Sequence, residues 1–341
     1  MIRAPRLLRA AQNLRRIGNA ASSLVSMAWL PTLAAAKPIG AAWRVTEVTD
    51  FGSNPGRLRM LAYAPERSLP AGAPLIVVMH GCQQDAVGFA TDAGWLDLAK
   101  RLRIPLVLPE QTAENNRGRC FNWFRPDDVG RDRGEAMSVR QMVRTAAKRF
   151  GSDRRRVFIV GLSAGGAMAT AMLAAYPAVF AAGAVVAGMP VGAASTSSMA
   201  LLRMRRASPF SSRAGLVAAV RAAAPAGGGK AWPRLSIWQG GRDRTIDPAN
   251  AEALAAQWSA LHGFDSIPAS DTEPATGVRR RAWGRAGHPA VEFWTLASMG
   301  HGFPVDPATA GGGRSGPWMV DAGVAAAQRI AAFWGIDRTP S

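Results

Sequence analysis

Six short and mostly apolar runs recur along the chain, with longer segments of helical character between most of them. Several of the runs are apolar at consecutive positions, which is typical of strands that are covered on both faces. Covered strands that alternate with helices predict an α/β fold with a mostly parallel sheet flanked by helices. The expected strands lie at residues 75–79, 104–108, 157–160, 182–187, 235–239 and 290–296.

A pair of strands is expected ahead of this series, at 44–48 and 57–63, joined as an antiparallel hairpin through Asn54-Pro55-Gly56. Helices are predicted at 95–103, 135–150, directly after residue 163, at 248–262 and at 318–334. The last of these has Val320, Val324, Ala327, Ile330 and Trp334 on one face, and Gly335 ends it.

Two longer segments do not fit this alternation. Residues 112–134 are polar but contain Phe121, Trp123 and Phe124, so we expect an ordered functional loop there. Residues 190–233 are rich in Ser, Ala and Gly and contain two short helical patterns, so we expect a small lid or cap insertion. With no repeat and no interdomain linker, residues 44–341 are predicted to form one catalytic domain.

The N-terminal segment, residues 1–36, differs from the rest. Arginines precede a mildly apolar run at 17–33, which ends in Ala34-Ala35-Ala36, and this order is typical of a secretory signal. The segment also fits an amphipathic helix with Leu7, Leu14 and Ile17 on its apolar side. We favour export to the periplasm or the extracellular space, and no other run is apolar enough over a sufficient length to span a bilayer.

The net charge is +18, and nearly all of the positive charge comes from arginine. Such a charge could indicate binding to nucleic acid or another anionic polymer. However, the arginines are scattered, with short runs at 154–156 and 279–281, and no basic helix is interleaved with aromatic residues. We therefore expect no nucleic-acid partner and interpret the charge as a bias in composition.

Cys82 and Cys120 are the only cysteines. They form either a single disulfide, as suits an exported protein, or two buried thiols. No C-x-x-C pair occurs and the four histidines are dispersed, so no metal site is expected.

The segment Gly161-Leu162-Ser163-Ala164-Gly165 follows an apolar strand and precedes a stretch of small helix-forming residues. A G-x-S-x-G sequence between strand and helix is the nucleophile elbow, a sharp turn that exposes the serine hydroxyl at the edge of a sheet. We therefore predict that Ser163 is a catalytic nucleophile.

A serine nucleophile needs a base and an acid that orients the base, and after an elbow these follow in the order Asp or Glu, then His. His301 fits the base because it follows the last expected strand in a glycine-flanked loop. Asp243 fits the acid because it lies in the loop after the strand at 235–239. Asp247 precedes Pro248, a favoured first helical position, so we assign it to the helix cap.

Ester or amide hydrolysis also needs two N–H donors for the oxygen that becomes negative. The amide of Ala164, next to the nucleophile, is one candidate. The second is expected from the loop after the strand at 75–79, where His80-Gly81-Cys82 stands, and we assign it to the amide of Cys82.

Several segments together resemble the poly(3-hydroxybutyrate) depolymerase-type esterases, which are related to feruloyl and acetylxylan esterases. They are His80-Gly81-Cys82-Gln83-Gln84, Arg119-Cys120-Phe121-Asn122-Trp123-Phe124, the elbow through Met168, Gly240-x-x-Asp243-x-x-Ile246-x-Pro248-x-Asn250 and Gly300-His301. The resemblance runs from about residue 44 to the C-terminus.

The resemblance implies an α/β-hydrolase fold, hydrolysis of carboxylic esters by Ser163, Asp243 and His301, and an extracellular setting. It also implies a Cys82–Cys120 disulfide, and its motifs place Gln83 and Trp123 where they would contact substrate. Two features depart from the family. No linker and second, polymer-adsorbing domain follow, so attack on crystalline polymer is not expected, and the insertion at 190–233 carries no motif that we can match.

We predict a serine esterase that needs no cofactor and acts on hydroxyalkanoate oligomers, aromatic esters or acetyl esters. An acyltransferase on the same fold is an alternative, since only the acyl acceptor differs. A non-catalytic binder of anionic polymer is an alternative of another class. The sequence does not define an oligomeric state.

Overall fold

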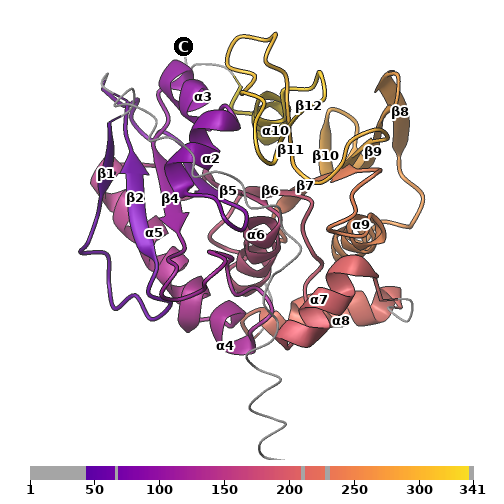
Figure 1. Cartoon of the computed structure of the whole chain (residues 1–341), viewed down its shortest axis with the longest axis horizontal. Coiled ribbons are helices and arrows are strands. Elements are labelled where there is room, and N and C mark those ends of the chain that lie inside the picture. The colour runs from indigo at the N-terminus through magenta and orange to yellow at the C-terminus, as the bar shows by residue number, and fades with distance from the viewer. Residues whose placement is uncertain (1–43, 66–67, 209–211, 227–230, 338–341) are drawn as a thin grey trace, which may run out of the picture. The chain divides into compact units, whose positions relative to one another are not determined.

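A ten-stranded sheet organises the computed structural model, which describes residues 44–65, 68–208, 212–226 and 231–337 (Figure 1). The predicted N-terminal segment, residues 1–36, lies outside the described residues. The strands follow one another across the sheet in the order β1 (Val45–Glu47), β2 (Arg59–Tyr63), β4 (Leu106–Glu110), β3 (Leu75–Met79), β5 (Val157–Leu162), β6 (Ala182–Val186), β7 (Arg234–Gly240), β10 (His288–Leu296), β9 (Val278–Arg285) and β8 (Ser270–Ala275).

The central strands, from β4 across to β10, pair in parallel, and antiparallel strands extend the sheet at both edges. The consecutive apolar residues of β3 alternate between two cores: Leu75, Val77 and Met79 face one, and Ile76 and Val78 face the other. The predicted mostly parallel sheet and the N-terminal hairpin are therefore confirmed.

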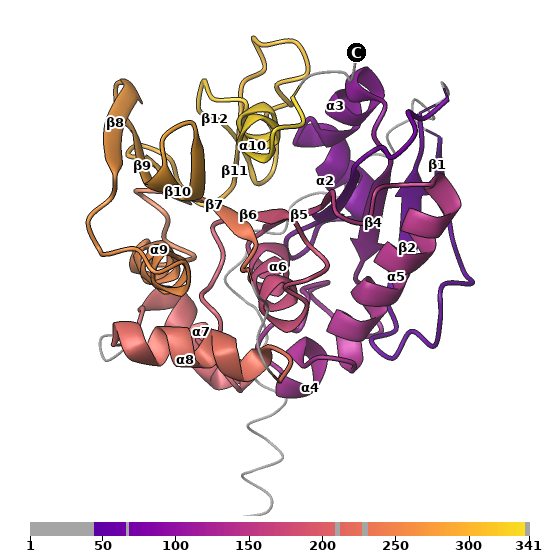
Figure 2. The ribbon, with the colours of Figure 1, turned by 180° about the vertical axis from the view of Figure 1, so that it is seen from behind.

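Helices cover both faces of the sheet, as the two views of the ribbon show (Figures 1 and 2). One core lies under α5 (Gly134–Phe150), α6 (Ala164–Ala175), α8 (Arg213–Ala223) and α9 (Ala249–Leu261). The other lies under α2 (Ala86–Asp92), α3 (Trp95–Leu102) and α10 (Ala326–Trp334). No helix in the described part of the chain is both long and apolar enough to cross a membrane.

The prediction of one helix over 318–334 is wrong for its first half. Residues Met319–Asp321 form β12, which pairs in parallel with β11 (Phe303–Val305), and only Ala326–Trp334 is helical. Trp318 and Gly323 have φ angles of 64° and 61°, which an α-helix does not allow. The apolar spacing was compatible with a helix, but the strand pairing and the left-handed residues exclude it.

The β8–β9 hairpin was not predicted, because its residues do not alternate between apolar and polar. Ion pairs stabilise the hairpin instead. Arg279 pairs with Asp271 across the hairpin, Arg280 pairs with Glu292 of β10, and Arg281 pairs with Glu252 of α9. The three arginines of the run at 279–281 are thus paired with acidic residues of the sheet and α9.

The insertion at 190–233 contains α7 (Ser197–Arg205) and α8, in agreement with the two helical patterns. It is held to α9 through the Gln257 side chain, which accepts from the Val191 N–H and donates to the carbonyls of Val191 and Leu216. Its role as a lid stays a prediction.

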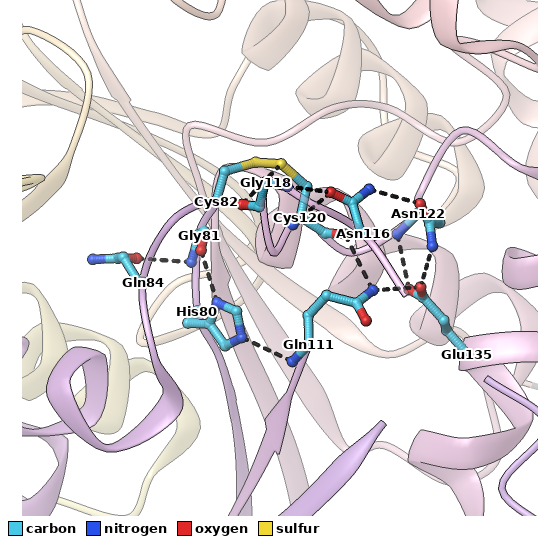
Figure 3. Close-up of a disulfide and its surroundings, with 10 residues drawn as sticks. All are labelled: His80, Gly81, Cys82, Gln84, Gln111, Asn116, Gly118, Cys120, Asn122 and Glu135. Atoms are coloured by element: carbon cyan, nitrogen blue, oxygen red, sulfur yellow. Dashed lines mark hydrogen bonds between the residues drawn. A yellow bond between two sulfur atoms is a disulfide. The ribbon is translucent and has the colours of Figure 1, made fainter. Parts of the chain in front are cut away.

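The loop at 112–134 is ordered, as predicted, and a buried carboxylate at the start of α5 holds it. Glu135 is fully buried and accepts hydrogen bonds from the Asn122 N–H, the Asn122 side chain and the Gln111 side chain at 2.8, 2.6 and 2.6 Å (Figure 3). Burial raises its pKa from 4.5 to about 7, although the Asn122 and Gln111 donors oppose the shift. The loop contains one short helix, α4 (Pro126–Val129).

The buried carboxyl group should make stability depend on pH. Because the pKa of Glu135 is higher in the folded state than the reference value of 4.5, its contribution to the free energy of unfolding is complete below pH 4.5 and is lost as pH rises through about 7. The loss amounts to at most about 3 kcal/mol. Burial lowers the pKa of His80, so the contribution of His80 to the free energy of unfolding rises with pH while that of Glu135 falls. The effect of Glu135 must therefore be measured as a difference between variants.

We therefore expect the difference in unfolding free energy between the wild type and Glu135→Gln to shrink as pH rises from 4.5 to 8. Urea unfolding across this range measures it. Glu114→Gln is the matched control, because Glu114 lies in the same loop but is exposed. Parallel stability curves for the wild type and Glu135→Gln would contradict the assignment.

Candidate active site

The turn from β5 into α6 has the geometry of an elbow. Ser163 has φ 56° and ψ −116°, a combination that costs free energy for any residue with a Cβ atom, and its N–H donates to the Val186 carbonyl at 2.8 Å. Its neighbours on either side are the last residue of β5 and the first residue of α6. The predicted sharp turn between strand and helix is therefore built into the backbone, and Ser163 itself is largely buried, with 9% of its surface exposed.

The loops after β7 and β10 meet at the same edge of the sheet, because these strands are parallel neighbours. A Cβ atom on Gly240 would lie 2.3 and 2.4 Å from the carbonyl oxygens of Gly300 and Met299, so only glycine allows this approach. The approach brings His301 to Asp243, with 2.7 Å between Nδ1 and Oδ2. The structure thus joins the predicted base and acid.

Asp243 is buried and held as a carboxylate. Its Oδ1 accepts from the N–H groups of Thr245 and Ile246, both at 2.8 Å, and its Oδ2 also accepts from the Gln239 side chain at 3.0 Å. Burial favours the neutral acid, but the hydrogen bond and charge of His301, together with the two backbone donors, outweigh it and lower the pKa of Asp243. The carboxylate oxygen can only accept, so Nδ1 of His301 carries the proton of this hydrogen bond, and Nε2 is the nitrogen that can accept a proton whenever the ring is neutral.

Asp247 has structural contacts, as predicted, but the N-cap residue of α9 is Pro248 rather than Asp247. Its Oδ1 accepts from the Ala249 N–H at the start of α9, and its Oδ2 accepts from the Ala207 N–H just after α7. The carboxylate therefore ties the first residue of α9 to the segment just after α7.

The loop after β3 lies against the start of α6. A Cβ atom on Gly165 would lie 2.4 Å from the carbonyl oxygens of both Met79 and His80. The Gly81 N–H is occupied, since it donates to Oε1 of Gln84 at 2.8 Å. Within the described residues, by contrast, the N–H groups of Cys82 and Ala164 have no acceptor. The two predicted oxyanion donors are therefore free.

A disulfide joins Cys82 to Cys120, as the resemblance implied, and links this loop to the loop at 112–134 (Figure 3). The Gln83 N–H donates to the Gly118 carbonyl, and the Arg119 side chain donates to the Gln83 carbonyl, both at 2.8 Å. The backbone of Gln83 is thus used for structure, and contact of its side chain with substrate stays a prediction.

Trp123 packs on a small apolar cluster next to the elbow. The cluster consists of Ala167 in the second turn of α6, Met189 and Ile246, with Ala193 and Met204 at its side. Ile246 lies three residues after Asp243, so the cluster connects α6 with the loop that carries Asp243. This agrees with the prediction that Trp123 faces substrate, but no contact tests it.

Sequence reasoning missed two neighbours of these residues. Trp318 packs edge-on against the His301 ring with 5.9 Å between ring centroids, and nothing in the sequence indicated its left-handed backbone. Glu135 could have been suspected, as an acidic residue at a helix start directly after a loop rich in amide side chains. Nowhere in the described ranges do three or more His, Cys, Asp or Glu side chains gather in a way that could hold a metal ion.

Comparison with known proteins gives one family and one fold. The model of the Esterase PHB depolymerase family matches residues 59–285. The chain is 38% identical over 298 residues to poly(3-hydroxyalkanoate) depolymerase C of Paucimonas lemoignei, which covers 86% of this chain and 70% of that protein. It is 27% identical over 286 residues to feruloyl esterase B of Talaromyces funiculosus, covering 82% and 77% of the two chains.

Among solved structures, the acetyl xylan esterase from Aspergillus awamori superposes with a TM-score of 0.72 at 22% identity, covering 86% of this chain and 99% of that one. The likeness supports the α/β-hydrolase fold. The family model and the identity to the depolymerase extend over most of the chain. The chain therefore belongs to the Esterase PHB depolymerase family and is a carboxylic-ester hydrolase.

Proposed function

We propose that the chain hydrolyses esters through an acyl-enzyme on Ser163, with His301 as the base and Asp243 as the acid that orients it. The observation that supports this most directly is the 2.7 Å contact between His301 and Asp243, which are 58 residues apart. Their loops leave the same edge of the parallel sheet as the Ser163 elbow. The alternative of a non-catalytic polymer binder gives no reason for this contact.

In the proposed first step, Nε2 of His301 takes the hydroxyl proton while Oγ of Ser163 bonds to the ester carbon. The carbonyl electron pair moves to oxygen, and the N–H groups of Cys82 and Ala164 donate to the oxyanion. When the intermediate collapses, the bond to the alcohol oxygen breaks and His301 returns the proton to that oxygen. Water then attacks the acyl-enzyme in the same manner, which releases the acid and restores Ser163.

The N-terminus of α6 adds to this stabilisation. Ala164 is its first residue, so the positive end of the helix dipole lies next to the nucleophile. Each oxyanion donor in such a site contributes about 3 kcal/mol to transition-state stabilisation.

For the substrate, we propose 3-hydroxyalkanoate oligomers as the first candidate, ahead of aromatic and acetyl esters. The relative named as a poly(3-hydroxyalkanoate) depolymerase is the more similar of the two compared, at 38% against 27% identity. Trp123 is partly exposed over the buried apolar cluster of Ala167, Met189 and Ile246 and would offer a short-chain acyl group an apolar wall.

We also propose that residues 44–341 are the catalytic domain and that the protein acts in the periplasm or outside the cell. The disulfide supports an oxidising compartment. The N-terminal residues 1–36 would then serve as the export signal.

The triad assignment predicts a clear ranking of variants. Ser163→Ala should abolish hydrolysis of p-nitrophenyl butyrate, and Asp243→Asn should lower kcat by about 10⁴-fold because the imidazole loses its orienting acceptor. Asp247→Asn is the matched control, since it changes a carboxylate four residues away that does not contact His301. It should lower the melting temperature and leave kcat within about threefold. A larger kcat loss for Asp247→Asn than for Asp243→Asn would contradict the choice of acid.

The substrate assignment predicts the order of kcat/KM on a panel of three esters: a 3-hydroxybutyrate trimer, methyl ferulate and acetylated xylobiose. The trimer should be hydrolysed at least tenfold more efficiently than the other two. Trp123→Ala should lower kcat/KM for the trimer more than for the acetyl ester, because a larger acyl group uses more of the apolar wall. A higher kcat/KM for methyl ferulate would redirect the assignment to aromatic esters.

A further inference from the structure

His80 is a fully buried histidine that the proposed mechanism does not use. It directly follows β3, and both ring nitrogens are engaged (Figure 3). Nδ1 lies 2.7 Å from the Gly81 carbonyl oxygen, and Nε2 lies 3.1 Å from the Gln111 N–H, just after β4. The Phe121 ring packs beside it with 5.0 Å between ring centroids. The imidazole therefore bridges the loop after β3 to the neighbouring strand.

The partners of the two nitrogens determine the tautomer. A backbone N–H can only donate, so Nε2 must accept from Gln111 and carries no proton. A carbonyl oxygen can only accept, so Nδ1 carries the proton and donates to Gly81. Burial lowers the pKa of His80 and keeps the ring neutral, even though the charges of Glu110 and Asp85 act in the other direction. Only one protonation state satisfies both contacts.

The Gly81 carbonyl belongs to the same peptide group as the Cys82 N–H. This group is planar and trans, so fixing the direction of its oxygen fixes the opposite direction of its N–H. The disulfide restrains the position of Cys82, but it does not prevent rotation of the peptide plane between Gly81 and Cys82. Gly81 has no Cβ atom to restrict such a rotation. The Gly81 carbonyl accepts from His80 at 2.7 Å and from the more distant Gln84 N–H at 3.4 Å, so the bond from His80 is the closer of the two restraints on this rotation.

We infer that His80 is a positioning residue that orients the Cys82 N–H toward the oxyanion of the transition state. The inference rests on the proposed function, because it takes Cys82 as an oxyanion donor. The bond from Nδ1 to the carbonyl should also polarise the peptide and strengthen the N–H as a donor. Because the oxyanion exists only in the transition state, the effect belongs to kcat rather than to KM.

Two substitutions separate the two contacts of the ring. The side-chain amide of Asn reaches about as far as Nδ1, so His80→Asn can still donate to Gly81. The longer Gln amide reaches about as far as Nε2, so His80→Gln keeps the contact to Gln111 and loses the one to Gly81. His262→Gln is the control, because His262 contacts the Pro233 carbonyl before β7, at the opposite end of the strands from the site.

We expect His80→Gln to lower kcat for p-nitrophenyl butyrate by about 10- to 100-fold, with KM nearly unchanged. This loss is smaller than the loss of kcat when an oxyanion donor is removed altogether, because the Cys82 N–H is still present. The affinity for a trifluoromethyl ketone, whose adduct carries the oxyanion, should fall by the same factor as kcat/KM. The decrease in log kcat for His80→Asn should be less than a third of that for His80→Gln, and the two variants should have similar melting temperatures. The kcat of His262→Gln should match that of the wild type.

Equal kcat losses for the two His80 variants, or an unchanged trifluoromethyl ketone affinity, would overturn the inference. The proposed function fails separately, through an active Ser163→Ala variant. A measurement on the wild type covers the case in which a variant does not fold. Nitrogen-15 NMR of the imidazoles should show His80 as the neutral Nδ1–H tautomer at pH 7, and finding the Nε2–H tautomer would exclude the inference.

Discussion

Direct contact between backbones at the carboxyl edge of the sheet is the constraint on which the active site depends. At Gly165 the start of α6 touches the end of β3, and at Gly240 the end of β7 touches the loop that carries His301. A Cβ atom at either position would lie 2.3 to 2.4 Å from backbone oxygens, so the segments would have to move apart. The proposed oxyanion donors and the His301–Asp243 pair therefore exist because two glycines let distant parts of the chain approach each other.

Around these contacts, polar groups are buried at a cost that only complete hydrogen bonding offsets. Glu135, Gln111 and Asn122 form one connected set, and the Gln111 N–H leads from it to His80. The set joins the loop at 112–134 to β4 and α5, and the disulfide joins the same loop to Cys82. The apolar cores stabilise the sheet as a whole, whereas this polar set determines where two loops lie at its edge.

The large positive charge has a smaller structural consequence than its magnitude suggests. The arginine run at 279–281 is paired with three acidic partners from three different elements. Two of these pairs include an exposed partner and contribute little to stability, but the one with Glu292 is partly buried and joins β9 to β10. Arginine thus serves here to hold an edge hairpin that has few apolar residues.

Much of the fold was determined by local pattern. Buried parallel strands are apolar along their whole length, so β3 and β5 were evident, and the elbow was evident because its G-x-S-x-G sequence begins at the end of such a strand. The choice of Asp243 over Asp247 followed from loop position and from the helix that begins after Pro248. Only the tertiary structure decided which residues meet: the strand in place of a helix at 319–321, the β8–β9 hairpin, and the contacts of Glu135, Trp318 and His80. The physical reason is that local preference acts within a few residues, whereas these features depend on partners far away in the sequence, such as Gln111 for His80 and β11 for β12.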